Sequence, residues 1–176
     1  MKKYDYKKTE VILKNKVTPA VLAALAIVIL TYVLYYLGFD LQYGIGSSAI
    51  LFASFGSSAF VLFLMPRSKA AAIDAFVKSY LLAAALGLVG FYMLGILPLY
   101  LVSGIILLAL ALMMYMSSAE HPPAVGIAMA FILYKIDIYG VLVVALGVVV
   151  LIFLRFVLER FVYILEKDLI KDVETR

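Results

Sequence analysis

The sequence predicts an all-α integral membrane protein with about six spans. Two observations lead to this fold class. Of the 176 residues, 66% are hydrophobic and 15% are charged, and the mean hydropathy is +1.12, a composition that excludes a soluble globular domain. The apolar residues also gather in runs of about 20, the length that crosses the hydrocarbon core of a bilayer as a helix. A single integral membrane domain follows.

Five of these runs are long enough to cross a membrane. In chain order they are residues 18–37, 44–65, 79–97, 98–118 and 139–157. A sixth apolar segment, from Pro122 to Tyr134, has only about thirteen residues, so as a helix it would reach about 20 Å of the roughly 30 Å core. We expect this segment to cross as a short half-span; the alternative is a re-entrant hairpin.

The positions of lysine and arginine orient the spans. Basic residues crowd segment 1–16 and the end of the chain, and further ones follow the second span at Arg67 and Lys69. The positive-inside rule puts these regions in the cytoplasm, and two cytoplasmic termini require an even number of crossings. We therefore expect a multi-pass protein of the cell membrane with cytoplasmic N- and C-termini and with membrane lipid as a partner.

The chain divides into three parts. Residues 1–16 are a basic cytoplasmic segment, residues 17–157 the transmembrane domain, and residues 158–176 a cytoplasmic amphipathic helical tail. Apolar residues of the tail recur at steps of three and four, which predicts one stripe on a helix that continues the last span. The stripe consists of Leu158, Val162, Leu165, Leu169 and Val173. It would lie on the membrane or pair with another subunit, so homo-oligomers through the tail or the transmembrane domain are an open expectation.

Six spans form two sets of three that begin on opposite sides of the membrane, as in a 3+3 inverted repeat. The middle span of each set is irregular: GSSA occurs at residues 46–49 and 56–59, and HPPA at residues 121–124. Glycine- or proline-interrupted segments in matching positions of two halves point to a transporter binding site.

Several kinds of chemistry are excluded. Every charged side chain falls in a tail, in a loop or at the end of a span, and the chain has no cysteine and one histidine. Proton relays and many sodium sites need an intramembrane carboxylate, and a hydrolase needs a nucleophile with a base or a set of metal ligands. We therefore expect no enzyme activity, catalytic residue, metal site or cofactor, and no nucleic-acid partner.

Neutral polar groups remain as candidates for binding. A helix break at Gly56 would expose the amides of Ser57, Ser58 and Ala59, and these amides with two hydroxyls would converge on a small oxyanion. The alternative interpretation is that glycine and serine only allow close helix packing. Most of the thirteen tyrosines lie near predicted span ends, Tyr80 among them, and are interpreted as interfacial anchors.

The HPPA sequence predicts the start of a half-helix. Pro122 and Pro123 fit the first helical turn, with His121 as the cap. An anion there would depend on the imidazole, on the amides of Ala124 and Val125, and on the helix dipole. Glu120 next to the histidine would favour its protonated form. The alternative is that His121 merely caps a helix at the interface.

These two blocks resemble the HPP family of integral membrane proteins. Phe55, Gly56, Ser57, Ser58 and Ala59 match the family's F-G-x-S-A block, and residues 121–124 match its eponymous block, so the resemblance runs from about Pro19 to Phe156. The family is usually described with about four spans, and its members in plant chloroplasts and cyanobacteria are nitrite transporters. In place of the family's usual G-A-T-A after HPPA, this chain has residues 125–128, VGIA, and lacks the threonine hydroxyl.

The resemblance implies a transporter or channel for a small inorganic anion such as nitrite. The expected binding residues are Gly56, Ser57, Ser58, Ala59, His121, Pro122, Pro123, Ala124 and Val125. Two other functions fit the uncharged interior: a membrane scaffold or partner subunit without transport, and a facilitator for a neutral solute.

Overall fold

The structure is a computed structural model that describes residues 6–36, 39–44, 46–65 and 68–174. These residues form helices and connecting turns, with no strand among them, so the predicted all-α class is confirmed. The elements in chain order are α1 (Tyr6–Tyr36), α2 (Phe39–Tyr43), α3 (Ser47–Leu64), η1 (Lys69–Ala71), α4 (Ile73–Met93), α5 (Leu99–Met116), η2 (Pro122–Ala124), α6 (Val125–Leu133) and α7 (Ile138–Glu174).

Four of the described helices are long and apolar enough to cross a membrane. They are α3, α4, α5 and the Ile138–Val157 part of α7. The other two predicted spans correspond to shorter apolar stretches, Ala23–Val33 within α1 and Pro122–Leu133. The chain is therefore a multi-span membrane protein by length and composition.

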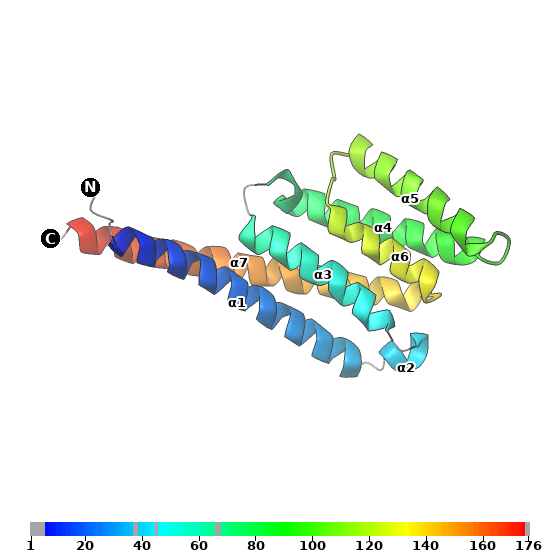
Figure 1. Cartoon of the computed structure of the whole chain (residues 1–176), viewed down its shortest axis with the longest axis horizontal. Coiled ribbons are helices and arrows are strands. Elements are labelled where there is room, and N and C mark those ends of the chain that lie inside the picture. Colours follow the sequence, from blue (N-terminus) through cyan, green and yellow to red (C-terminus); the bar gives the residue numbers. More distant parts are fainter. Residues whose placement is uncertain (1–5, 37–38, 45, 66–67, 175–176) are drawn as a thin grey trace.

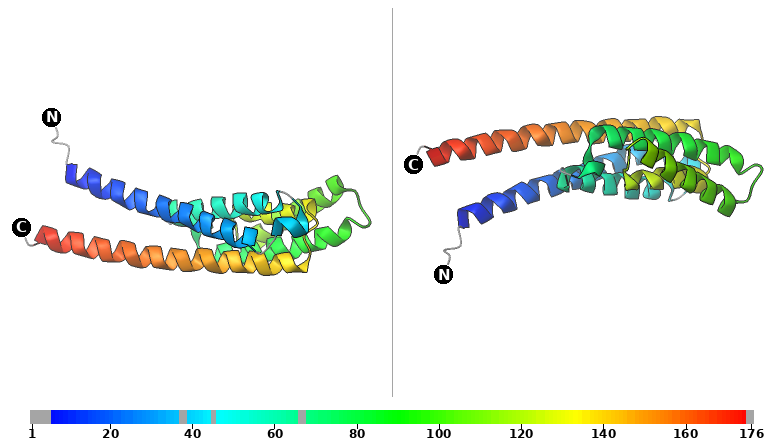
Figure 2. Two further views of the ribbon diagram at one scale, coloured as in Figure 1. Left: turned by 90° about the horizontal axis from the view of Figure 1, so that it is seen from below. Right: turned by 90° about the horizontal axis from the view of Figure 1, so that it is seen from above.

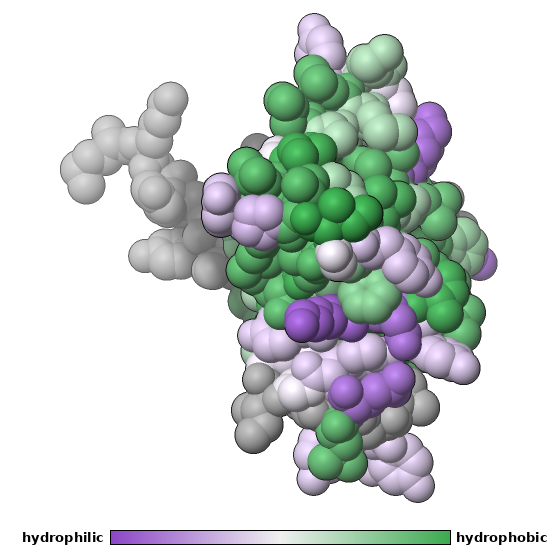
Figure 3. Space-filling model, turned by 90° about the vertical axis from the view of Figure 1, so that its right-hand side faces the viewer, coloured by the Kyte–Doolittle hydropathy of each residue, from purple (hydrophilic) through white to green (hydrophobic). Residues whose placement is uncertain are grey.

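The main helices run in alternating directions. Figure 1 shows α1, α4 and α6 leading away from the end of the molecule where the termini lie, and α3, α5 and α7 leading back toward it. The views in Figure 2 agree that the N- and C-terminal ends share one end of the molecule, where α1 and α7 extend beyond the other helices. Figure 3 faces the opposite end, where hydrophobic surface covers most of the upper part of the view and hydrophilic and weakly hydrophilic surface gathers in the lower part.

The short helix α6 lies at the centre of the bundle. Its side chains Ile127, Ala128, Ala130, Phe131 and Ile132 are buried, and it contacts α3, α4 and α5. The predicted short segment is therefore confirmed as a helix, preceded by the 3-10 turn η2 at the two prolines. It leads from His121 to the end opposite the termini, where the chain enters α7 (Figure 1).

The predicted helix break at Gly56 is wrong. Helix α3 is continuous from Ser47 to Leu64, so the amides of Ser57, Ser58 and Ala59 belong to the interior of the helix and not to an exposed N-terminus. The glycines that do interrupt the backbone are Gly44 and Gly46, with φ of 95° and 97°, in the turn before α3. An anion site built on amides at Gly56 is thereby excluded.

Helix α7 continues without a break to Glu174, so the predicted helical continuation of the last span is observed. The stripe at Leu158, Val162, Leu165, Leu169 and Val173 lies on side chains outside the described part of the chain.

Candidate functional site

The turn at the C-terminal end of α5 determines the position of His121. Ser118 adopts a left-handed φ of 51°, and the Ala119 N–H donates to the Met114 carbonyl at 2.8 Å, while Ser118 N–H donates to Tyr115. This pair of bonds is a Schellman motif, which stops a helix and turns the chain. The chain then leads inward to His121, which immediately precedes η2 and is fully buried, at 0% exposed.

Both ring nitrogens of His121 bind groups on other elements. Nδ1 lies 2.6 Å from the carbonyl oxygen of Ala70 in η1, and Nε2 lies 2.8 Å from the hydroxyl of Ser58 on α3. A carbonyl oxygen only accepts hydrogen bonds, so Nδ1 carries a hydrogen. The imidazole makes no capping bond to its own helix, so the interpretation of His121 as a simple cap is wrong for the side chain.

Tyr80 of α4 extends this network. Its hydroxyl oxygen lies 2.6 Å from Ser58 Oγ and 3.2 Å from the carbonyl oxygen of Ser54, so both atoms are within reach of its one hydrogen. The tyrosine ring is stacked on Phe55 with centroids 5.3 Å apart, and Phe76 packs edge-on against the His121 ring at 5.1 Å. The His121 ring and the hydroxyls of Ser58 and Tyr80 are therefore held in an aromatic cage made by the rings of Phe55, Phe76 and Tyr80.

The predicted influence of Glu120 on the histidine is wrong. Burial lowers the pKa of His121 below its usual value, and the hydrogen bond to Ala70 raises it by a smaller amount. Glu120 is exposed, and water screens its charge. The neutral ring is consequently favoured at neutral pH, with Nδ1 as donor and Nε2 accepting from Ser58.

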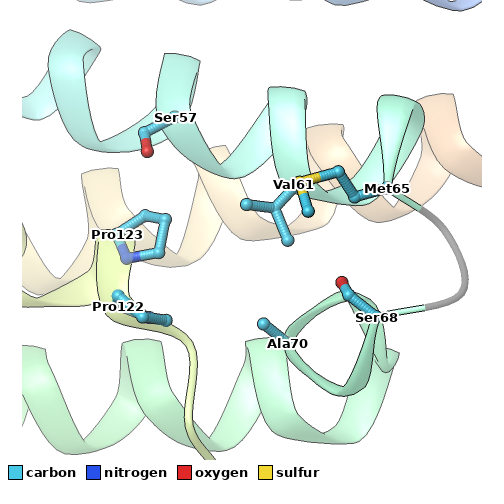
Figure 4. A pocket seen from close by; sticks show the side chains of 7 residues that line it. All are labelled: Ser57, Val61, Met65, Ser68, Ala70, Pro122 and Pro123. Atoms are coloured by element: carbon cyan, nitrogen blue, oxygen red, sulfur yellow. The ribbon is translucent and has the colours of Figure 1, made fainter.

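A pocket adjoins this cage, between the end of α3, the turn η1 and the two prolines. Its volume is about 410 Å³, within the range of small-molecule sites. Figure 4 shows the Ser57 and Ser68 hydroxyls beside it, with Ala70 and the prolines around the gap. The full lining is Ser57, Val61, Met65, Ser68, Ala70, Pro122 and Pro123. Ser68 Oγ is buried and has no hydrogen-bond partner among the described residues.

The structure separates the predicted binding residues into three groups. Ser57, Pro122 and Pro123 line the pocket, whereas Ser58 and His121 are hydrogen-bonded to each other and are not part of its lining. Ala59 and Ala124 are fully buried and Val125 packs against the core. Gly56 faces Ile27 of α1, whose side chain would lie 3.7 Å from an added Cβ. These four residues serve packing in this structure.

The sequence analysis did not assign three residues of this region to the site, namely Tyr80, Ser68 and Ala70. Tyr80 is 1% exposed, so its interpretation as an interfacial anchor is wrong. Ser68 and Ala70 belong to a basic loop, where a serine hydroxyl and a backbone carbonyl give no distinctive signal. The same turn is tied to α7, because the Arg155 guanidinium donates to the Ala71 carbonyl.

Comparison with known families supports the resemblance of the two sequence blocks. The family described as HPP, transmembrane region, matches residues 8–164. No curated protein matches the chain, and no solved structure does either. Because the family match covers nearly the whole chain, including α3 and the HPPA turn, the protein belongs to the HPP transmembrane family.

Proposed function

We propose that this protein is a transporter or channel for small monovalent anions, with nitrite as the family-implied substrate. The observation that carries the proposal is the buried hydroxyl of Ser68 beside the pocket, which has no hydrogen-bond partner among the residues that the structure describes. Buried polar groups in proteins almost always have a partner, and a hydroxyl donates readily to an anionic oxygen.

The chemistry of the pocket favours an anion over a cation. Its two polar side chains, Ser57 and Ser68, are neutral donors, and none of its lining residues is acidic. Lys69 is exposed beside the pocket, between two of the lining residues, and its charge attracts anions toward the entrance. The space exceeds what one small ion needs, so the anion would keep part of its water and selectivity among small anions would be low.

The proposal includes the course of the chain through the membrane. Six crossings with cytoplasmic termini would put the pocket at the cytoplasmic end, near Lys69. The alternating directions of the main helices support this course (Figure 1). Helices α1, α3 and α4 and helices α5, α6 and α7 then form two sets of opposite sense, which supports a 3+3 inverted arrangement. Transport of this kind requires neither a cofactor nor enzyme chemistry.

Nitrite flux into liposomes that contain the purified protein tests the proposal. We expect saturable uptake that falls about tenfold in the double variant Ser57→Ala/Ser68→Ala, because both donors to the anion are lost. The matched control is Ser103→Ala/Ser117→Ala on α5 and its C-terminal cap, outside the pocket lining, which should transport at the wild-type rate.

Two results would contradict anion transport. The first is flux no greater than in empty liposomes from protein that is folded by circular dichroism and gel filtration. The second is uptake of glycerol or urea that exceeds nitrite uptake and is insensitive to the serine variants, which would favour the neutral-solute alternative.

A further inference from the structure

The hydrogen bonds around His121 can be satisfied in two protonation states without moving a heavy atom. In the neutral state, Nδ1–H donates to Ala70, the Ser58 hydroxyl donates to Nε2, and the Tyr80 hydroxyl donates to Ser58 Oγ. Each of the two hydroxyls then donates its single hydrogen to one hydrogen bond. The Ser54 carbonyl, 3.2 Å from the Tyr80 oxygen, is the weaker of the two acceptors available to Tyr80.

In the protonated state, the hydrogen bonds between His121 and Ser58 and between Ser58 and Tyr80 run in the opposite direction. One proton from solvent is added to Nε2, which then donates to Ser58 Oγ; the Ser58 hydroxyl hydrogen turns to the Tyr80 oxygen, and the Tyr80 hydrogen turns to the Ser54 carbonyl. Only hydroxyl rotations are needed. Every donor again has an acceptor, which a buried imidazolium requires.

From this geometry we infer that His121, Ser58 and Tyr80 form a proton-binding site that takes up one proton when an anion enters the adjoining pocket. The inference rests on the proposed function. It deepens that proposal by making the proton a second ligand and transport an electroneutral co-binding of proton and anion.

The link between the two sites is structural. Ala70, whose carbonyl holds the imidazole, lines the pocket, and so does Pro122, the residue after His121. A positive charge on the ring would be buried with no carboxylate partner among the described residues around it, which is unfavourable. An anion bound in the pocket, next to Ala70 and Pro122, would compensate part of that charge, because a nearby opposite charge favours the protonated ring.

The other charged groups that the structure describes near the ring do not compensate its positive charge. On the elements packed against His121, α3 contributes hydroxyls and α4 contributes the Tyr80 phenol. Asp74 at the start of α4 is exposed and pairs with Lys78 at 3.5 Å. The remaining charged side chains among the described residues of this region are Glu120 and Lys69, both exposed, and Arg155, which bonds to Ala71.

Because the chain has one histidine, nuclear magnetic resonance of ¹⁵N-histidine-labelled protein with a histidine-free tag tests the inference directly. Without anion we expect the Nδ1–H tautomer at neutral pH. Saturating nitrite should raise the midpoint of ring protonation by about one pH unit or more, and nitrite should bind about tenfold more tightly near pH 5.5 than near pH 8.

A pair of tyrosine variants tests the relay, by which we mean the hydrogen bonds from His121 through Ser58 to Tyr80. Tyr80→Phe keeps the ring stacked on Phe55 but removes the oxygen that accepts from Ser58 in the protonated state, so the midpoint should fall by roughly one unit. Tyr92→Phe is the same change on the same helix, at a side chain that is 65% exposed, and should leave the midpoint unchanged. Equal midpoints for the two variants would overturn the relay.

Calorimetric titration with nitrite separates the two proposals. Nitrite that binds without moving the histidine midpoint, or a ring found as the Nε2–H tautomer, overturns the proton site and leaves anion binding intact. Absence of nitrite binding at every pH between about 4.5 and 8 overturns the proposed function, and the co-binding fails with it.

Discussion

Each ring nitrogen of His121 joins the start of the HPPA turn to a different element. Nδ1 holds η1 through Ala70, and Nε2 holds α3 through Ser58. Tyr80 adds α4 to the same group of bonds. One side chain thus connects the loop after α3 with the helices on both sides of it, and changes at the ring should affect stability as well as binding.

The burial of His121 predicts a stability that falls with acid. The folded-state pKa lies below the unfolded value of about 6.5, so below about pH 6.5 the unfolded chain binds a proton that the folded chain does not. Stability is complete above pH 6.5 and is lost toward the folded pKa, by at most about 1.4 kcal/mol per pH unit. Thermal unfolding in gluconate salt, in which no small inorganic anion is present to bind, measures this dependence between about pH 7.5 and 5.

His121→Gln is the comparison for this experiment. The variant should melt at a lower temperature at pH 7.5, because bonds to η1 and α3 are lost, and its melting temperature should change less between the two pH values. Parallel pH dependences in the two proteins would show that another group is responsible.

At this scale the sequence identified His121, Ser57 and Ser58 but not their roles. The local neighbour Glu120 suggested a charged ring, whereas the fold places Glu120 in solvent and buries the imidazole. Tyr80 could not be distinguished from the other tyrosines, because its burial depends on α3 and on the HPPA turn, which are distant in the sequence. Partnerships of this kind follow from tertiary packing and have no local signature.

At the scale of elements, the contact between α4 and α6 depends on the absence of a side chain at Gly87. A Cβ there would lie 2.9 Å from Phe131 Cβ, 3.0 Å from Ala128 Cα and 3.2 Å from the Ala128 carbonyl oxygen. Two of these atoms are backbone and cannot rotate away. Because α6 begins four residues after His121, a displaced α6 would also pull the ring from Ser58.

We therefore expect Gly87→Ala to destabilise the protein by about 1–3 kcal/mol, the usual cost of overpacking. Gly104→Ala on α5 is the matched control, since an added Cβ there meets nothing within 4 Å; better helix propensity should leave it neutral or slightly stabilised. Melting temperatures in one detergent make the comparison. Equal values for the two alanine variants would mean that α4 and α6 separate without cost.

Helix positions were largely predictable, because apolar runs of membrane length specify them. The predicted helix break at Gly56, which the continuous helix α3 does not have, was the exception. Gly56 has the same sequence character as Gly46, yet Gly56 faces Ile27 within a continuous helix while Gly46 adopts a positive φ in a turn. A membrane helix keeps its backbone bonds wherever it can, so a glycine that allows packing and a glycine that ends a helix differ only in their three-dimensional neighbours.

At the scale of the whole molecule, the two ends of the bundle are built differently. The pocket and the His121 network lie beside the loop between α3 and α4. At the other end, Tyr43 of α2 donates to Asp137 at 2.6 Å, and Asp137 also accepts from the Tyr139 N–H at the start of α7. This tie holds α2 against the α6–α7 turn, and burial together with Asp137 raises the pKa of the Tyr43 phenol.

The course of α6 decides how these two ends relate to the membrane. If α6 completes a crossing, Met116 and Lys135 lie on opposite sides; if it is re-entrant, they share a side. The chain has no cysteine, so single cysteines report accessibility without background. Met116, Lys135, Leu41 and Ile96 are all exposed, which makes them suitable positions.

In intact cells treated with a membrane-impermeant maleimide, Leu41→Cys, Ile96→Cys and Lys135→Cys should react, and Met116→Cys should react only after the membrane is opened. The expectation follows from the alternating helix directions (Figure 1) together with the proposed orientation, in which the positive-inside rule puts the basic segments in the cytoplasm. Protection of Lys135→Cys together with Met116→Cys would instead make α6 a re-entrant helix. In that case α7 would begin on the cytoplasmic side, and its C-terminal end would have to be outside the cell, although it shares one end of the molecule with the start of α1 (Figure 2).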